Sequence, residues 1–160
     1  MSLERWIAQN EEAVVWLERK YKKKTGGPTD FCHELFMWSF GDGRRPQRGW
    51  LVGQQRDMEV EFGIERSLLY IPEDLDSWKT ITKYAKEVAG QPIAVEGHRP
   101  DNYDDYHIAA FVWSAEIGAW VVFDSRVCGG KLVTDDKGLH DWATDVFDIN
   151  TLQYFHVRCS

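Results

Sequence analysis

The sequence predicts an α+β protein in which N-terminal helices pack on a mainly antiparallel sheet, built as a single domain over residues 1–160. Apolar residues near the N-terminus recur at helical spacing, whereas Met58, Val60, Phe62 and Ile64 alternate with Glu59, Glu61 and Glu65. A third segment, residues 106–124, has the pattern of a β-hairpin. Helical and strand segments do not alternate in the manner of βαβ units, which favours antiparallel pairing.

The composition restricts the kinds of partner. The formal net charge is −7 and the isoelectric point about 5.2, which argues against a general nucleic-acid binder. Cys32, Cys128 and Cys159 are odd in number and suit neither a disulfide framework nor a Cys-x-x-Cys metal site, so we expect reduced thiols. No apolar run reaches the ~18–20 residues that cross a membrane. We therefore expect a cytoplasmic protein with no membrane partner, and delivery to another cell by a specialised secretion route remains an alternative.

The N-terminal third is expected to hold two helices. Residues 2–24 form a long amphipathic helix that Gly26-Gly27-Pro28 ends. Residues 29–40 fit a helix or a strand by periodicity, and the flanks favour a helix, because Thr29 or Asp30 is a good N-cap and Gly41 or Gly43 a good end.

The remaining elements follow from the same signals. Residues 50–56 and 58–71 are strand-like, Pro72-Glu73-Asp74 opens a further helix that ends at Gly90, and residues 92–96 form a short strand. An acidic loop, residues 97–105, precedes the hairpin, and a final strand over residues 151–159 is expected at an edge of the sheet. The inner face of the helix that Pro72 opens is Leu75, Trp78, Ile81, Ala85 and Val88, and that of a short helix after the hairpin is Leu139, Trp142, Ala143, Val146 and Phe147.

The hairpin brings together a candidate catalytic pair. If residues 114–117 form its loop, with Gly118 at positive φ, Trp113 faces Gly118 and His107 faces Asp124. An aspartate that accepts from one imidazole nitrogen fixes the tautomer and leaves the other nitrogen as a base. Two inert polar residues at the strand ends are the simpler interpretation.

A candidate nucleophile lies upstream. Cys32 falls in the first turn of the helix expected at residues 29–40, where the positive end of the helix dipole favours thiolate. A small buried hydrophobic residue is the commoner fate of such a cysteine.

The order of these residues resembles that of papain-like Cys-His-Asp enzymes. Asp105-Tyr106-His107-Ile108, then Val122-Phe123-Asp124, is similar to motifs of protein N-terminal glutamine amidohydrolases, and papain-fold toxin deamidases share the arrangement. Phe31-Cys32-His33-Glu34 with Trp38 resembles the segment around their nucleophile.

The resemblance implies a minimal papain-like fold and a cysteine-dependent amidohydrolase that deamidates glutamine in a peptide or protein through a thioester. Cys32 would attack the amide, His107 would act as base and acid, and Asp124 would orient the imidazole. Trp38, Tyr106 and Asp105 would bind substrate, and no cofactor or metal is implied. Cys128 is an alternative nucleophile that chain order disfavours.

Two other functions remain open on the sequence. A small acidic α+β protein is also typical of immunity or inhibitor proteins, which would cover a basic partner surface with Asp101, Asp104, Asp105 and aromatic anchors. A metal hydrolase would use His98, Asp101 and His107, although their spacing matches no established motif.

Overall fold

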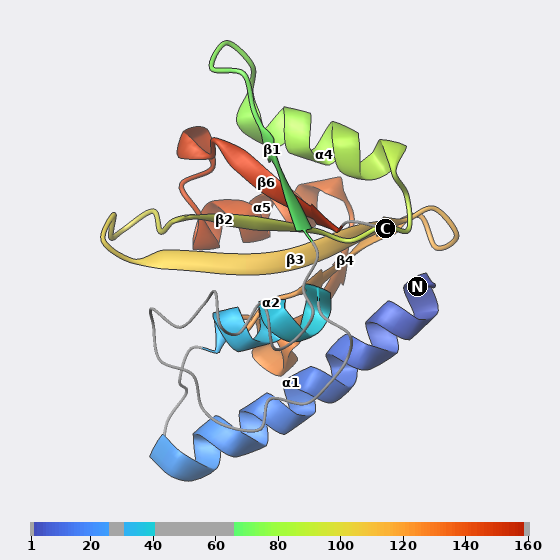
Figure 1. Ribbon diagram of the computed structural model, residues 1–160, viewed down its shortest axis with the longest axis vertical. Coiled ribbons are helices and arrows are strands. Elements are labelled where there is room, and N and C mark those ends of the chain that lie inside the picture. The colour runs from blue at the N-terminus through green and yellow to red at the C-terminus, as the bar shows by residue number, and fades with distance from the viewer. Residues whose placement is uncertain (1, 26–30, 41–65, 159–160) are drawn as a thin grey trace.

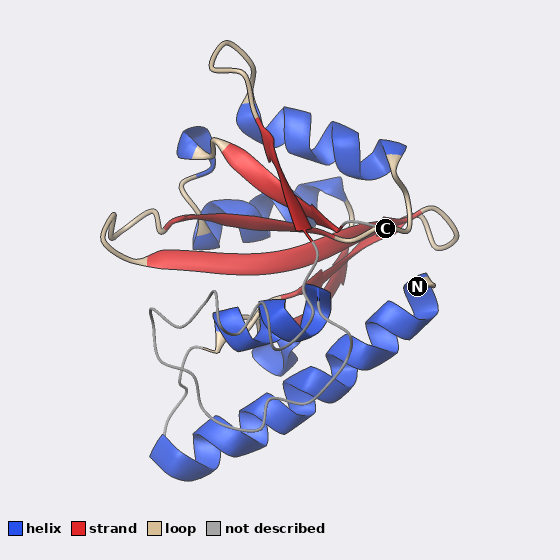
Figure 2. Cartoon of the chain, in the orientation of Figure 1, coloured by secondary structure: helices blue, strands red, loops and turns tan. Residues whose placement is uncertain are grey.

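The computed structural model describes residues 2–25, 31–40 and 66–158, and these form an α+β structure. Six strands make one antiparallel sheet in the order β1-β6-β2-β3-β4-β5. Helices α1 and α2 cover one face of the sheet, and α4 and α5 cover the other (Figures 1 and 2). The predicted class and the packing of the N-terminal helices on the sheet are confirmed.

The elements have the following bounds. The helices are α1 (Leu3–Thr25), α2 (Cys32–Phe40), α4 (Ser77–Glu87) and α5 (Asp136–Val146), with short 3-10 turns η1 (Cys128–Gly130) and η2 (Ile149–Thr151). The strands are β1 (Arg66–Tyr70), β2 (Ile93–His98), β3 (Tyr106–Ser114), β4 (Ala119–Phe123), β5 (Lys131–Thr134) and β6 (Tyr154–Arg158). No helix in these ranges is long and apolar enough to cross a membrane.

The first core layer, here called the α2-side core, lies between the sheet and α1 and α2. Trp6 is buried there, and its indole N–H donates to the Ser39 carbonyl at 3.0 Å, which joins the two helices. The sheet contributes Ala94 from β2, Ile108, Ala110 and Val112 from β3, and Val121 and Phe123 from β4. Both N-terminal helices therefore form as the sequence predicts, because each buries an apolar face on the sheet.

The second layer, the α5-side core, lies between the sheet and α4 and α5. Trp78, Ile81 and Ala85 of α4 are buried there, as predicted. The helix begins later than predicted, because the Asp76 side chain accepts from the Lys79 backbone N–H at 2.9 Å and caps it. Leu75 precedes this cap and is exposed, so its assignment to the inner face was wrong. From α5, Leu139, Trp142, Ala143 and Val146 enter this core, and Phe147 follows them.

Two features of the sheet differ from the sequence analysis. The final strand, β6, lies between β1 and β2, so its expected place at an edge was wrong. Among the described strands the two outermost are β1 and β5, and β5 is a four-residue strand that the sequence analysis did not identify. Of the strand-like runs at residues 50–56 and 58–71, only the end is described, as β1, and the rest lies outside the described residues.

Candidate functional site

The predicted His–Asp pair is present in the structure. His107 is the second residue of β3, and Asp124 directly follows β4. The His107 Nε2 atom lies 2.6 Å from Asp124 Oδ1, and both side chains have no exposed surface. The pairing therefore forms inside the protein.

The register differs from the predicted one by two residues. Trp113 pairs with Trp120 and Ser114 with Ala119, so the loop is residues 115–118 and not 114–117. Gly118 has φ of +63°, as expected for this loop. A shift of two residues keeps every side chain on its face, so His107 and Asp124 meet as diagonal neighbours.

The Asp124 carboxylate has two further donors that the sequence analysis did not assign. Trp142 of α5 donates from its indole nitrogen to Oδ2 at 2.7 Å, and the Arg126 backbone N–H donates to Oδ1 at 3.1 Å. The sequence offered one signal for the bond from Trp142, because the N–H of a buried tryptophan needs an acceptor. The carboxylate thus joins β3, β4 and α5.

The pair lies on the α5 side of the sheet. The His107 ring packs against the Phe147 ring, with centroids 5.5 Å apart. Gly97 stands opposite His107 on β2, and a Cβ added at Gly97 would lie 2.6 Å from Leu152 Cδ2, which belongs to the α5-side core. Because Gly97 has no side chain, Leu152 can occupy the space beside the His107 imidazole.

Cys32 lies in the other core layer. It lies in the first turn of α2, as predicted, and is the first residue of that helix; it is buried in the α2-side core with Ile108 and Ala110 of β3. Because side chains alternate along a strand, His107 points to the opposite face from Ile108. Cys32 and the His107–Asp124 pair thus belong to different layers. The alternative nucleophile, Cys128, is exposed in η1.

The predicted substrate-binding residues differ in their exposure to solvent. Trp38 is buried in the α2-side core against Trp16, so it holds α2 to α1 and its assignment to a substrate surface was wrong. Tyr106 is exposed, with its hydroxyl 3.2 Å from His98 Nε2. The Asp105 carboxylate lies 3.5 Å from Arg99 Nε and 3.7 Å from an Arg126 nitrogen.

The loop between β2 and β3, residues 99–105, is here called the acidic loop. It projects at the left of Figure 1. Its ends are joined by a hydrogen bond from the Arg99 backbone N–H to the Asp105 carbonyl at 3.0 Å. Its tip is held by Asn102, whose carbonyl accepts from the Asp105 N–H and whose side chain accepts from the Asp104 N–H, each at 3.1 Å. The loop therefore has a defined conformation.

Tyr103 attaches this loop to the neighbouring turn. Its hydroxyl donates to Asp148 Oδ2 at 2.6 Å, and its carbonyl lies 2.6 Å from His98 Nδ1. The hydrogen bond to Asp148 and the negative charge of that carboxylate raise the pKa of the Tyr103 hydroxyl above its usual value of 10.0. The Asp101 and Asp104 carboxylates remain at the surface.

A second buried polar group, unassigned by the sequence analysis, lies at β1, β6 and β2. Arg66 lies 2.7 Å from His156 Nδ1, and His156 Nε2 lies 3.2 Å from Glu96 Oε2. A guanidinium only donates, so Nδ1 accepts and the ring proton is on Nε2, facing Glu96. Both imidazole nitrogens are therefore engaged in a bridge between the strands.

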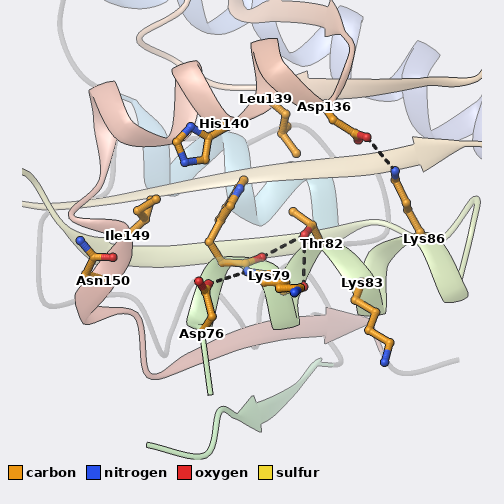
Figure 3. A pocket seen from close by; sticks show the side chains of 11 residues that line it. Asp76, Lys79, Thr82, Lys83, Lys86, Asp136, Leu139, His140, Ile149 and Asn150 are labelled. Carbon is orange, nitrogen blue, oxygen red and sulfur yellow. Dashed lines mark hydrogen bonds and ion pairs between the residues drawn. The ribbon is translucent and has the colours of Figure 1, made fainter. Parts of the chain in front are cut away.

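A groove of about 640 Å³ lies between α4 and α5 (Figure 3). His140 extends over the groove from α5, and the charged residues of the lining are Asp76, Lys79, Lys83, Lys86 and Asp136, of which Lys86 and Asp136 pair at 3.0 Å. We find no group of three or more possible metal ligands among the described residues, and His98 and His107 lie on opposite faces of the sheet. The metal site proposed from His98, Asp101 and His107 is therefore not assembled.

Comparison with models of known protein families gave no match, and comparison with curated proteins also gave none.

Proposed function

We propose that this protein is a binding module of the immunity or inhibitor type, which docks the acidic loop on a basic surface of a partner protein. One observation carries the proposal. The acidic loop is fixed by its own hydrogen bonds while the side chains of Asp101, Asp104 and Tyr103 face solvent. A loop ordered before binding loses less conformational entropy when a partner docks.

The charge of the protein supports the same interpretation. A net charge of −7 attracts a basic partner over distance and raises the association rate, and carboxylates at the rim of an interface select against acidic partners. Tyrosine is among the side chains that most often anchor protein interfaces.

The burial of the His107–Asp124 pair also favours this proposal over catalysis. Each of the three donors to Asp124 comes from a different part of the fold, and the pair lies under Phe147. Such an arrangement stabilises the core whether or not a substrate is bound.

The experiment is affinity capture with the full-length protein, from extracts of the cells that produce it. We expect at least one captured protein with a basic surface whose recovery falls several-fold with Asp101→Asn/Asp104→Asn and with rising salt. The charge-matched control is Asp141→Asn/Asp145→Asn, which alters two exposed carboxylates of α5. If every captured protein responds equally to both double variants, the acidic loop is not the docking site.

The second candidate is the cysteine-dependent glutamine deamidase. It is favoured by two observations: the 2.6 Å His107–Asp124 contact, and Cys32 at the first residue of a helix. It requires α2 and β3 to move so that the thiol reaches the imidazole. Ammonia release from glutamine peptides that Cys32→Ala and His107→Ala each abolish while the variants stay folded would establish it, and release that survives Cys32→Ala would exclude this mechanism.

A further inference from the structure

Four of the six tyrosines in the chain gather near one end of the sheet or in the loop beside it. Tyr70 ends β1 and pairs with Tyr154, which begins β6. Tyr106 begins β3 and pairs with His98, which ends β2. Tyr103 adds a ring from the acidic loop, 5.4 Å from the His98 ring. We call Tyr70, Tyr103, Tyr106, Tyr154 and His98 the tyrosine surface.

The strand residues of this surface share one face of the sheet. His156 is opposite Ala94, a residue of the α2-side core, and the alternation along β6 and β2 places Tyr154 and His98 on that same face. Tyr70 and Tyr106 are directly opposite them and so face the same way. The tyrosine surface therefore begins at the acidic loop and extends over four neighbouring strands, β3, β2, β6 and β1.

The rings are largely open to solvent. Tyr70, Tyr103 and Tyr106 are 73%, 58% and 51% exposed, and Tyr154 is half-buried. The rings also support one another, with centroids 4.3 Å apart for His98 and Tyr106 and 6.0 Å apart for Tyr70 and Tyr154. Exposed aromatic side chains grouped in this way mark interaction surfaces.

Among the described residues, carboxylates outnumber guanidinium groups around the rings, although Arg99 Nε lies 3.6 Å from Asp101 and 3.5 Å from Asp105. The carboxylates are those of Glu96, Asp101, Asp104, Asp105 and Asp148, and the guanidinium groups are those of Arg66, Arg99 and Arg126. Burial and then the nearby Glu96 charge raise the pKa of Tyr154 above its usual value of 10.0, while Arg66 opposes this effect. A cation placed over these rings would meet a ring face and a carboxylate together.

We propose that the tyrosine surface binds arginine side chains of a partner protein, stacked on the rings of Tyr70 and Tyr106 and paired with the carboxylates around them, which are those of the acidic loop beside Tyr106 and that of Glu96 beside Tyr154. Arginine is favoured over lysine because its planar guanidinium stacks on an aromatic face and also forms forked hydrogen bonds to a carboxylate. This inference rests on the proposed binding function and adds the chemistry of the partner and the surface that it covers.

The test measures binding of two fluorescent peptides of equal length and charge, one alternating Arg and Gly and one alternating Lys and Gly, to the full-length protein by anisotropy. We expect saturable binding with tighter affinity for the arginine peptide. Tyr70→Leu and Tyr106→Leu should each weaken arginine-peptide binding by about twofold to fivefold, the factor that a cation–π contact at an exposed site contributes. Ile117→Ala, at an exposed position in the hairpin loop, is the matched control and should bind as the unaltered protein does.

The outcomes separate this inference from the proposed function. Loss of binding with Asp101→Asn/Asp104→Asn but not with either tyrosine variant would overturn the tyrosine surface and leave the acidic loop as the docking site. Absence of saturable binding to both peptides would overturn the arginine proposal, while affinity capture tests the acidic loop independently. If sedimentation shows that the tyrosine variants dissociate an oligomer of this chain, the occupant is a second copy and the arginine proposal is wrong.

Discussion

Nε2 of His107 and Oδ1 of Asp124 lie 2.6 Å apart, and both side chains are fully buried beneath α5. The same carboxylate accepts from the Trp142 indole N–H and from the Arg126 backbone N–H. Asp124 therefore fastens the hairpin to the helix that covers it. The order of His107 and Asp124 in the sequence resembles that of catalytic residues, but in the structure the pair is buried and connects elements of the core.

This role predicts a large loss of stability when the carboxylate is removed. Asp124→Ala leaves the His107 and Trp142 donors buried without their acceptor, and we expect the free energy of unfolding to fall by about 3–5 kcal/mol. Asp124→Asn keeps the size and one acceptor oxygen, and it should cost about 1–3 kcal/mol. Urea unfolding measures both values.

Asp145→Asn is the control for this prediction, because Asp145 is exposed on α5. We expect it to stay within about 0.5 kcal/mol of the unaltered protein. If Asp124→Asn were as stable as this control, the pair would not hold the core, and a role in catalysis would regain support.

Local patterns in the sequence were sufficient to predict that His107 and Asp124 meet. They were not sufficient to predict whether Cys32 joins them. The hairpin loop and the alternation of side chains place His107 and Asp124 on one face even though the register was wrong by two residues. Whether Cys32 meets them depends on which face of the sheet α2 covers. That is decided by the packing of α2 with α1 and with Ile108 and Ala110, which no local pattern encodes.

The position of β6 was unpredictable for a similar reason. Its pairing with β1 joins segments more than eighty residues apart, as in the pair Arg66 and Arg158, and periodicity identifies a strand but not its neighbours. The short strand β5 has few residues to alternate, so its pairing with β4 was the only evidence for it. Helices α1, α4 and α5, by contrast, were predictable because their buried residues recur at helical spacing, whereas α2 was predicted from its flanking residues.

The cysteines should differ in reactivity in the folded protein. Cys128 is exposed in η1, whereas Cys32 is buried in the α2-side core. In a Cys159→Ser background, brief iodoacetamide treatment at neutral pH should modify Cys128 well before Cys32, because a buried thiol reacts only when the structure opens. Mass spectrometry of the peptides measures the order, and faster modification of Cys32 at mildly acidic pH would instead favour the deamidase.

Gly97 should be intolerant of a side chain. A Cβ there would lie 2.6 Å from Leu152 Cδ2, and Leu152 is buried, so we expect Gly97→Ala to cost about 1–3 kcal/mol of unfolding free energy. Leu152→Ala alone should also destabilise, by about 2–5 kcal/mol. The double variant should be more stable than the sum of the two losses predicts, because the smaller side chain at position 152 makes room for the methyl group added at position 97. Additive losses in the cycle would show that the two positions do not compete for the same space.

Asp136 should make stability depend on pH in the acid range. Its carboxylate accepts from the Trp120 indole N–H at 2.8 Å and from Lys86 at 3.0 Å, and these contacts, the first being the larger, lower the pKa of Asp136 below its usual value of 3.8. Because the folded state has the lower pKa, the contribution of Asp136 to the free energy of unfolding is fully present above the unfolded pKa and is lost as the pH falls through the folded pKa.

Since the side chain is 69% exposed, we expect Asp136→Asn to cost no more than about 1 kcal/mol at pH 7. Urea unfolding from pH 7 to pH 2 should show this difference shrinking below about pH 4. Asp141→Asn on the same helix serves as the control, and an Asp136→Asn deficit that stays constant with pH would mean that lost packing, and not charge, is responsible.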